Sequence, residues 1–299
     1  MFNRSLNVET FFTTPFGMNP TNGAKVFGVP LMVLKLMEGE PLDDVDPRIV
    51  VPVDPLDPKS GCICYTEQGF LDHLQAEDRA FPSAQGVRPK GIVVLTGRRA
   101  GKTALLQHKA LYDMSMVMSA SNYDAAVQGP GADFYFTSPN SGLDKLLKTN
   151  FDRLSSESWI GQYTSTMTNS SMYFEDRYRT RRSRIMFRGG ANAVLNTARG
   201  NSYQGWYADD LLFDKDPHLA FDATFSTLTN EGSQYVFAVT PWEDHPSRPL
   251  NYFNFTRNKD NYLGLALHTW EMNPAIPPAF YQNSMSSSGS LDEFTVKVV

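Results

Sequence analysis

The stretch Gly91-Ile-Val-Val-Leu-Thr-Gly-Arg-Arg-Ala-Gly-Lys-Thr103 decides the fold of this chain of 299 residues. Its first part, Gly91–Thr96, is a continuous apolar run, which is typical of a strand buried on both faces. A turn with two glycines follows, and from Lys102 to about Ala120 there is neither glycine nor proline, which predicts a helix. Strand, glycine turn and helix in this order are the context that a phosphate-binding loop requires.

The end of this turn, Gly101-Lys102-Thr103, predicts its chemistry. Backbone N–H groups of a glycine turn and of a helix N-terminus converge on phosphate oxygens. We expect Lys102 to reach the β- and γ-phosphates of a nucleotide and the Thr103 hydroxyl to hold Mg²⁺. The loop departs from the common template, because Thr96 stands at the first glycine position; a chance glycine turn is the alternative. The expected phosphate-binding residues are Gly97, Arg99, Ala100, Gly101, Lys102 and Thr103.

Short apolar runs alternate with helical segments along the rest of the chain. We expect strands at 133–137, 205–208 and 234–239, helices at 28–38, 67–79, 141–154 and 217–228, and a hairpin at 172–188. This alternation predicts an α/β fold with a mostly parallel, doubly wound sheet. Ligands of such sheets bind at the carboxyl ends of the strands.

Two aspartates directly follow the apolar run Gly205–Ala208. A carboxylate at the end of a strand beside a phosphate loop can hold Mg²⁺ through water, and its neighbour can deprotonate the attacking water. We assign Asp209 to the metal and Asp210 to the water; a polar strand end without function is the alternative. Thr240 ends the run before Pro241 and is either a sensor of the γ-phosphate or a plain strand-ending turn.

The composition narrows the classes of protein to which the chain can belong. Hydrophobic residues make up 41% of it, and no apolar run approaches the roughly 18 residues of a membrane span, so we expect a packed core and no membrane partner. The net charge of −5 argues against a protein that coats nucleic acid, but a DNA motor needs only a local basic contact. Cys62 and Cys64 are too few for a disulfide framework or a structural zinc site.

The densest positive charge falls in the expected hairpin. Its arginines are Arg177, Arg179, Arg181, Arg182, Arg184 and Arg188, with Tyr173, Phe174 and Tyr178 interleaved. They form either a contact for DNA or a neighbouring subunit, or the charged edges of a solvated hairpin that resists aggregation.

The order of these motifs resembles the ATPase domain of large terminase subunits, the motors that package DNA into tailed bacteriophage capsids. The matching stretches are 97–103, Thr137-Ser-Pro139, the hairpin end 184–190, Ala198-Arg-Gly200, Ala208-Asp-Asp210 and Val239-Thr-Pro241. Residues 268–277 are also similar to the segment after the ATPase core of that family. The resemblance covers about residues 65 to 298 and implies a P-loop NTPase fold of the ASCE, RecA-like kind.

The resemblance also implies roles for individual residues. Arg98 matches an arginine that acts in cis on the γ-phosphate, and Arg199 one that acts in trans from a neighbouring subunit; a capping arginine is the alternative for Arg199. Thr240 matches the motif that couples hydrolysis to movement. Gln68 is a candidate adenine contact, and Ser138 is a candidate contact to DNA phosphate.

One position departs from the family, which usually has Asp-Glu where this chain has Asp209-Asp210. Because aspartate is one methylene shorter, the carboxylate that activates water would be set back. A misplacement of about 1 Å can cost about a hundredfold in rate. Hydrolysis is therefore expected to be slow, to need the assembled ring, or to be lost.

The resemblance implies an ATP-hydrolysing motor, with ATP and Mg²⁺ as cofactors, that moves double-stranded viral DNA into a procapsid. It implies the portal protein and the small terminase subunit as partners, a homo-oligomeric ring, and a place in the host cytoplasm at the procapsid portal. We expect an irregular N-terminal arm at 1–60, the ATPase core at 61–245 and a small lid-like segment at 246–299. Since the chain ends where the family's nuclease domain begins, we expect no nuclease activity. Two alternatives stay open: a helicase-like DNA translocase, and an assembly protein that binds nucleotide while Asp210 disables hydrolysis.

Overall fold

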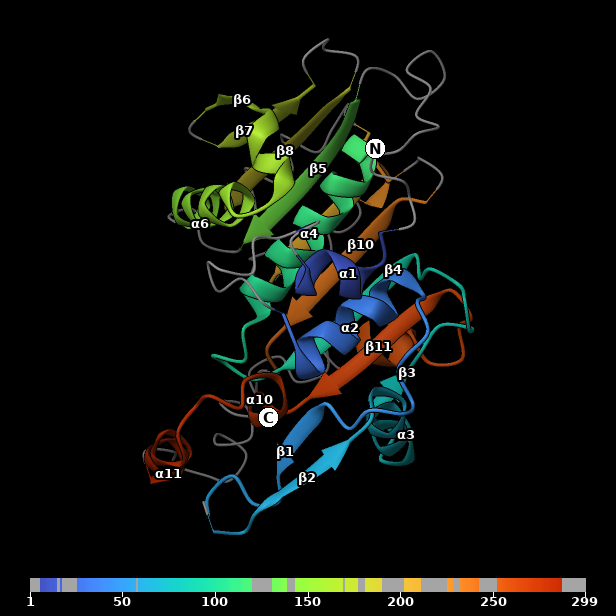
Figure 1. The fold of residues 1–299 in the computed structure, drawn as a ribbon, viewed down its shortest axis with the longest axis vertical. Coiled ribbons are helices and arrows are strands. Elements are labelled where there is room, and N and C mark those ends of the chain that lie inside the picture. The colour runs from blue at the N-terminus through green and yellow to red at the C-terminus, as the bar shows by residue number, and fades with distance from the viewer. Residues whose placement is uncertain are drawn as a thin grey trace. The chain divides into compact units, whose positions relative to one another are not determined.

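The computed structural model describes residues 6–14, 17, 26–57, 59–119, 131–138, 143–168, 170–176, 181–189, 202–210, 225–228, 232–241 and 252–286. The helices are α1 (Val8–Thr13), α2 (Gly28–Glu38), α3 (Glu67–Ala76), α4 (Lys102–Ser119), α6 (Asp144–Ser156), the 3-10 helix Trp159–Tyr163, α10 (Thr269–Met272) and α11 (Pro278–Ser286). The strands are β1 (Ile49–Pro52), β2 (Cys62–Tyr65), β3 (Ala80–Phe81), β4 (Gly91–Thr96), β5 (Gly131–Ser138), β6 (Thr164–Met167), β7 (Ser171–Glu175), β8 (Arg182–Gly189), β9 (Gly205–Asp209), β10 (Gln234–Val239) and β11 (Tyr262–Leu267). Figure 1 labels most of these elements.

Most strands of the described chain belong to one nine-stranded sheet, in the order β3-β11-β4-β10-β9-β5-β8-β7-β6. Strand β11 runs parallel to β4, and β5 runs parallel to both β8 and β9. Strands β3, β7 and β6 join the sheet in antiparallel pairs. The expected α/β class with a mostly parallel sheet is therefore confirmed. Strands β1 and β2 pair separately as a two-stranded antiparallel sheet.

The apolar runs of the sequence became the buried strands. All six residues of β4 and all six of β10 are buried, as continuous apolar strands with both faces covered should be. Helix α2 begins and ends at the expected residues, with Pro30 in its first turn. Gly39 ends it in a left-handed conformation, φ +70°, and its N–H bonds to the carbonyls of Lys35 and Leu36.

The chain forms two compact units. We call residues 1–26 together with 106–237 the first unit, and residues 27–105 together with 238–299 the second unit. The second unit contains the loop at 97–103 and Thr240, whereas the first unit contains Ser138, Asp209 and Asp210. The expected boundaries of the ATPase core, after residues 60 and 245, stay a prediction.

A polar cluster lies in the core of the first unit. The Lys109 side chain is fully buried, and its Nζ donates to Asp113 Oδ2 at 2.5 Å and to Gln234 Oε1 at 2.7 Å. The Tyr207 hydroxyl donates to the same Asp113 oxygen at 2.6 Å. Residues 109 and 113 lie one turn apart on α4, Tyr207 is on β9 and Gln234 begins β10. The cluster therefore ties three elements of the unit together by charge-assisted hydrogen bonds.

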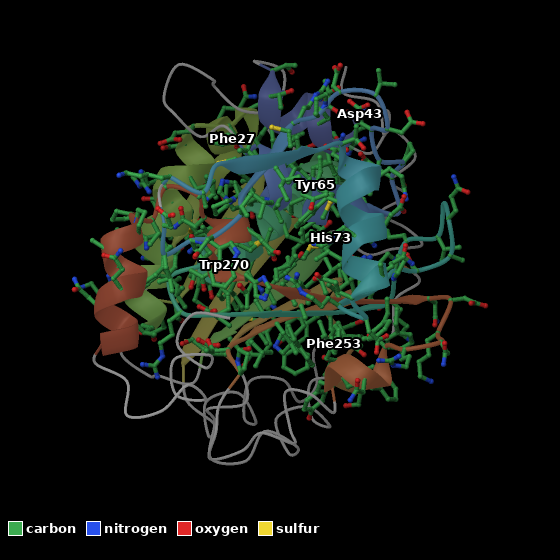
Figure 2. All side chains as sticks on the ribbon, turned by 90° about the horizontal axis from the view of Figure 1, so that it is seen from below. Phe27, Asp43, Tyr65, His73, Phe253 and Trp270 are labelled. Atoms are coloured by element: carbon green, nitrogen blue, oxygen red, sulfur yellow. The ribbon has the colours of Figure 1, made fainter. Side chains whose placement is uncertain are left out.

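The second unit contains a buried ion pair of its own. Lys35 of α2 donates to Glu67 of α3 at 2.9 Å, and both side chains are almost fully buried. The backbone N–H of Asp43 also donates to Glu67, at 2.9 Å. Nearby, the rings of Tyr65 and His73 stack with their centroids 5.3 Å apart. Figure 2 labels both residues. These contacts fix α2, α3 and the chain between them as one packed body.

No helix of the described residues combines the length and the apolar character that crossing a membrane demands. The expected helix at 217–228 lies mostly outside the described residues.

Candidate nucleotide-binding site

The loop at 97–103 connects a buried strand to a long helix, as the sequence predicted. Strand β4 ends at Thr96, and α4 begins at Lys102. Gly101 has φ +91°, and a Cβ built there would meet no atom within 4 Å. Glycine is therefore suited to this position by its backbone conformation and not by lack of space.

The sign of the backbone φ angle alternates from Arg99 to Gly101 in this loop. Arg99 has φ +65° and Gly101 has φ +91°, whereas Ala100 between them is not among the residues with positive φ. Successive residues of opposite hand can turn their backbone N–H groups toward one side, which is the arrangement of an anion-binding nest. A left-handed conformation costs a residue with a Cβ about 1–2 kcal/mol, so other contacts must hold Arg99 in it.

The Lys102 side chain bonds back to this loop. It is buried, and its Nζ donates to the carbonyl oxygen of Gly97 at 3.0 Å. The ammonium thus lies at the same loop in which Arg99 and Gly101 have positive φ. A phosphate bound there would offer the ammonium a charged acceptor in place of a neutral one, which gives a stronger hydrogen bond.

The segment after β11 contacts the loop directly. Asn273, at the C-terminal end of α10, donates from its side-chain amide to the carbonyl oxygen of Arg99 at 3.2 Å. The Arg99 guanidinium lies over the Phe280 ring of α11, 4.9 Å from its centroid. Sequence reasoning missed both residues; the one signal was the similarity of 268–277 to the segment that follows the ATPase core of terminases.

Helix α10 is itself firmly anchored within the second unit. Glu271 is buried and accepts from the His268 backbone N–H at 2.7 Å, as in a capping box. Both oxygens of Glu271 also accept from the Arg79 guanidinium, at 2.5 and 3.1 Å. The Arg79 Nε donates in addition to the Ala266 carbonyl of β11 at 3.1 Å. Asn273 therefore extends from a rigid support.

This anchor predicts a pH dependence of stability. Burial alone would raise the pKa of Glu271, but the hydrogen bonds and charges of His268 and Arg79 outweigh it and hold the pKa below its ordinary value. Since the folded pKa is the lower one, the stabilisation is fully present above the ordinary glutamate pKa of about 4.3 and is lost as the pH falls through the lowered pKa. We expect Glu271→Gln to lower the free energy of unfolding by about 1.5–3 kcal/mol at neutral pH, and by less in acid.

Urea unfolding of wild type and Glu271→Gln between about pH 3 and pH 7 measures this difference. Glu77→Gln is the matched control, because Glu77 bonds the same Arg79 at 2.9 Å but is exposed. The control should change stability by less than about 1 kcal/mol. A Glu271→Gln loss that is equal at both ends of this range would contradict the assignment.

Thr240 is buried and directly follows β10, in the second unit. It stands at the carboxyl end of a fully buried strand, where the sequence placed it. Its role in sensing or coupling stays a prediction.

The acidic pair lies in the first unit. Asp209 is the last residue of β9 and is buried, whereas Asp210 is partly exposed and has φ +50°. Aspartate and asparagine adopt this left-handed conformation more readily than other residues with a Cβ. The backbone therefore offers a physical reason for aspartate, and not glutamate, at position 210.

Ser138 ends β5 beside the acidic pair. In the parallel pairing of β5 and β9, Thr137 is the register partner of Ala208, so Ser138 and Asp209 follow at adjacent strand ends. The indole N–H of Trp206 donates to the Thr137 hydroxyl at 2.9 Å and fastens the two strands. The DNA contact expected of Ser138 stays a prediction, and Arg199 lies outside the described residues.

Gln68 and Arg98 are the two remaining candidates; Gln68 stands apart from the loop in the sequence, and Arg98 lies within it. Gln68 lies in the first turn of α3, and its amide donates to Asp72 at 2.7 Å. Its contact with adenine stays a prediction, as does the role of Arg98.

The arginine hairpin exists, as β7 and β8, and Arg177 and Arg179 lie outside the described residues. Arg184 pairs with Asp133, and Arg182 lies 4.4 Å from the centroid of the Tyr173 ring. Arg181 donates to the Met118 carbonyl at 2.9 Å. These contacts favour the interpretation of a hairpin with structural charges over a free basic surface.

Oxygen atoms are the candidate ligands for a metal ion in this chain. Among the described residues, no group of three or more histidine, cysteine, aspartate or glutamate side chains is placed to hold one. Cys62 and Cys64 are free and exposed on β2. Thr103 carries a hydroxyl and Asp209 a carboxylate, and each is by itself a hard oxygen donor of the kind that Mg²⁺ takes.

No protein-family model and no curated protein sequence matches this chain. Solved structures do match its fold. The large terminase of a thermophilic bacteriophage aligns with a TM-score of 0.52 and 12% identity, over 69% of this chain and 47% of that one. The large terminase of bacteriophage HK97 aligns with a TM-score of 0.51 and 11% identity, over 70% and 46%. The aligned part thus spans about half the length of these two proteins.

The ATPase domain of the Thermus phage P74-26 large terminase aligns with a TM-score of 0.50 and 14% identity, over 70% of this chain and 87% of that domain. The large terminase of the thermophilic bacteriophage in complex with ADP aligns with a TM-score of 0.50 and 12% identity, over 70% of this chain and 48% of that one. The chain therefore has the fold of large terminase ATPase domains, a P-loop NTPase fold. The expected fold class and the resemblance are both confirmed.

Proposed function

We propose that this chain is an ATP-hydrolysing motor domain of the large terminase kind, which moves double-stranded DNA into a procapsid. The observation that carries the proposal is the loop between β4 and α4, where the buried Lys102 donates to the Gly97 carbonyl and where Arg99 and Gly101 have positive φ. A nest, a helix N-terminus and an ammonium group together favour a polyphosphate ligand. The ADP complex of the thermophilic-phage terminase, which has the same fold, supports a nucleotide as that ligand.

Each of the proposed site residues has its own role in phosphoryl transfer. The N–H groups of Gly97, Arg99, Ala100 and Gly101 and the ammonium of Lys102 bind the phosphates, and Gln68 contacts adenine. Thr103 and Asp209 would hold Mg²⁺, which neutralises charge that builds on the phosphate oxygens. Asp210 takes the proton of the attacking water, and Arg98 and Arg199 stabilise the charge of the transferring group.

Movement requires partners. We propose that Thr240 couples hydrolysis to motion and that Ser138 contacts the DNA backbone. A ring of copies would act at the portal protein in the host cytoplasm and receive DNA through the small terminase subunit. In this ring Arg199 completes the site of a neighbouring copy.

Steady-state ATP turnover with Mg²⁺, measured without DNA and with linear double-stranded or single-stranded DNA, tests the proposal. We expect turnover that double-stranded DNA raises, and DNA that stays intact. Stimulation by single-stranded DNA with strand separation would contradict a packaging motor. A wild-type protein that neither binds nor hydrolyses ATP would contradict the proposal as a whole.

One observation favours a second function, in which the chain binds nucleotide and assembles without hydrolysis. Asp210 has the shorter side chain and a left-handed backbone at the position of the expected water-activating carboxylate. ATP binding without turnover, in the presence of DNA and of every proposed partner, would establish this second function.

Asp210→Glu separates these two functions. The longer side chain should restore the reach of the carboxylate and raise turnover, by up to about a hundredfold if the setback is about 1 Å. The left-handed backbone should reduce this gain, because glutamate tolerates it less well than aspartate. Single-turnover rates of wild type, Asp210→Glu and Asp210→Asn measure the effect. A glutamate variant slower than wild type would show that aspartate has the right length here.

A further inference from the structure

We propose that Asn273 is a positioning residue of the phosphate loop, which aims the backbone N–H of Ala100 at the bound phosphate. The inference rests on the proposed nucleotide site and adds to it a residue far away in the sequence. Its basis is one hydrogen bond across 174 positions, from the Asn273 amide to the Arg99 carbonyl oxygen at 3.2 Å.

Because of the geometry of the peptide unit, this contact fixes the direction of the Ala100 N–H group. The carbonyl of Arg99 and the N–H of Ala100 belong to the same planar, trans peptide, so they point in opposite directions. A donor that holds the carbonyl on one side of the peptide therefore fixes the N–H on the opposite side. Ala100 itself is buried, which leaves its peptide little room to turn.

The loop needs such a support at this residue. Arg99 has φ +65°, a conformation that side chains with a Cβ adopt at a cost, and surrounding contacts must maintain it. The same segment supplies a second contact, because the Arg99 guanidinium lies 4.9 Å from the centroid of the Phe280 ring. Main chain and side chain of Arg99 are thus both held by residues 273–280.

The support is rigid enough for this role. Thr269, Glu271 and Met272 of α10 are buried, and Glu271 is bonded at both oxygens. Asn273 caps this helix, with its N–H on the Thr269 carbonyl. Its side chain therefore approaches the loop from a fixed backbone.

Asn273→Leu tests the proposal, since leucine has a similar shape but no donor and no charge. We expect the dissociation constants for both MgATP and MgADP to rise about tenfold, the worth of one hydrogen bond that orders the loop. Gln282→Met is the matched control: Gln282 lies on α11, the helix of Phe280, and donates to the Leu56 carbonyl at 3.0 Å. The control should bind both nucleotides as wild type does.

Three further readouts separate positioning from plain structural damage. The thermal midpoints of the two variants should stay within about 2 °C of wild type. Asn273→Gln, which keeps the donor, should recover part of the affinity. Amide hydrogen exchange at Ala100 should accelerate in Asn273→Leu but not in Gln282→Met.

Two results would overturn the inference and differ in meaning. If wild type binds nucleotide and Asn273→Leu binds it equally well, Asn273 has no positioning role and the proposed function stands. If wild type binds no nucleotide, the proposed function fails and the inference fails with it.

Discussion

Lys102→Ala will lower ATP turnover at least about a hundredfold, because it removes the ammonium group that the loop holds at its own backbone. The Lys102 side chain is buried and bonds the Gly97 carbonyl at 3.0 Å, so it is held in place before any nucleotide arrives. A charge that is oriented beforehand stabilises the transition state without reorganisation. Turnover with saturating MgATP, measured side by side with wild type, gives the effect.

Lys90→Ala is the matched control for this substitution. Lys90 immediately precedes β4, at the end of the strand opposite the loop, and is exposed. Its removal takes away the same charge and should leave turnover within about twofold of wild type, since exposed charges contribute little. Equal losses in both variants would mean that Lys102 acts only through the net charge of the unit.

Lys109→Met will lower the free energy of unfolding by about 3–5 kcal/mol, because it leaves the buried Asp113 carboxylate without its cation. Methionine fills a similar volume, so lost packing contributes little to the effect. Lys109 also bonds Gln234, which begins β10, and Asp113 accepts from Tyr207 of β9. The substitution should therefore loosen three elements of the first unit at once, and urea unfolding measures the loss.

Lys148→Met provides the comparison for that loss. Lys148 is partly exposed and donates to the Thr168 carbonyl at 2.7 Å, so it too makes a hydrogen bond, but one that water can reach. Its replacement should cost less than about 0.5 kcal/mol. If Lys109→Met cost no more than this, the buried cluster would not be the support of the first unit that its contacts indicate.

Local sequence patterns predicted the strands and helices whose formation depends mainly on their own residues. The apolar run 91–96 became β4, and the run 234–239 became β10, each with the expected ends. Both strands are buried on two faces, so their composition alone identifies them. Helix α2 was predicted with its observed bounds, with Pro30 in its first turn, and the structure adds that Gly39 ends it with a positive φ.

Elements that depend on distant partners escaped prediction. Strand β11 pairs with β4 and β3, but its sequence contains Gly264, which weakens the pattern of a strand. That glycine is required by space, since a Cβ there would lie 2.1 Å from the Thr256 hydroxyl oxygen. No local pattern reports such a contact.

In the candidate site, too, some features follow from the local sequence and others only from the folded chain. The loop, the acidic pair and Thr240 follow from motifs at the ends of strands. The contact of Asn273 with Arg99 spans 174 positions and appears only once the chain is folded. The left-handed backbone of Asp210 is likewise seen only in the folded chain, and the sequence showed only the choice of aspartate.

Calorimetric titration of MgATP into the wild-type protein and into Lys102→Ala tests the central claim most directly. We predict saturable binding at one site per chain in wild type, and binding weakened at least about tenfold in the variant, which loses a charged hydrogen bond to phosphate. Absence of binding to wild type, or equal binding to both proteins, would contradict the assignment of residues 97–103 as a phosphate loop.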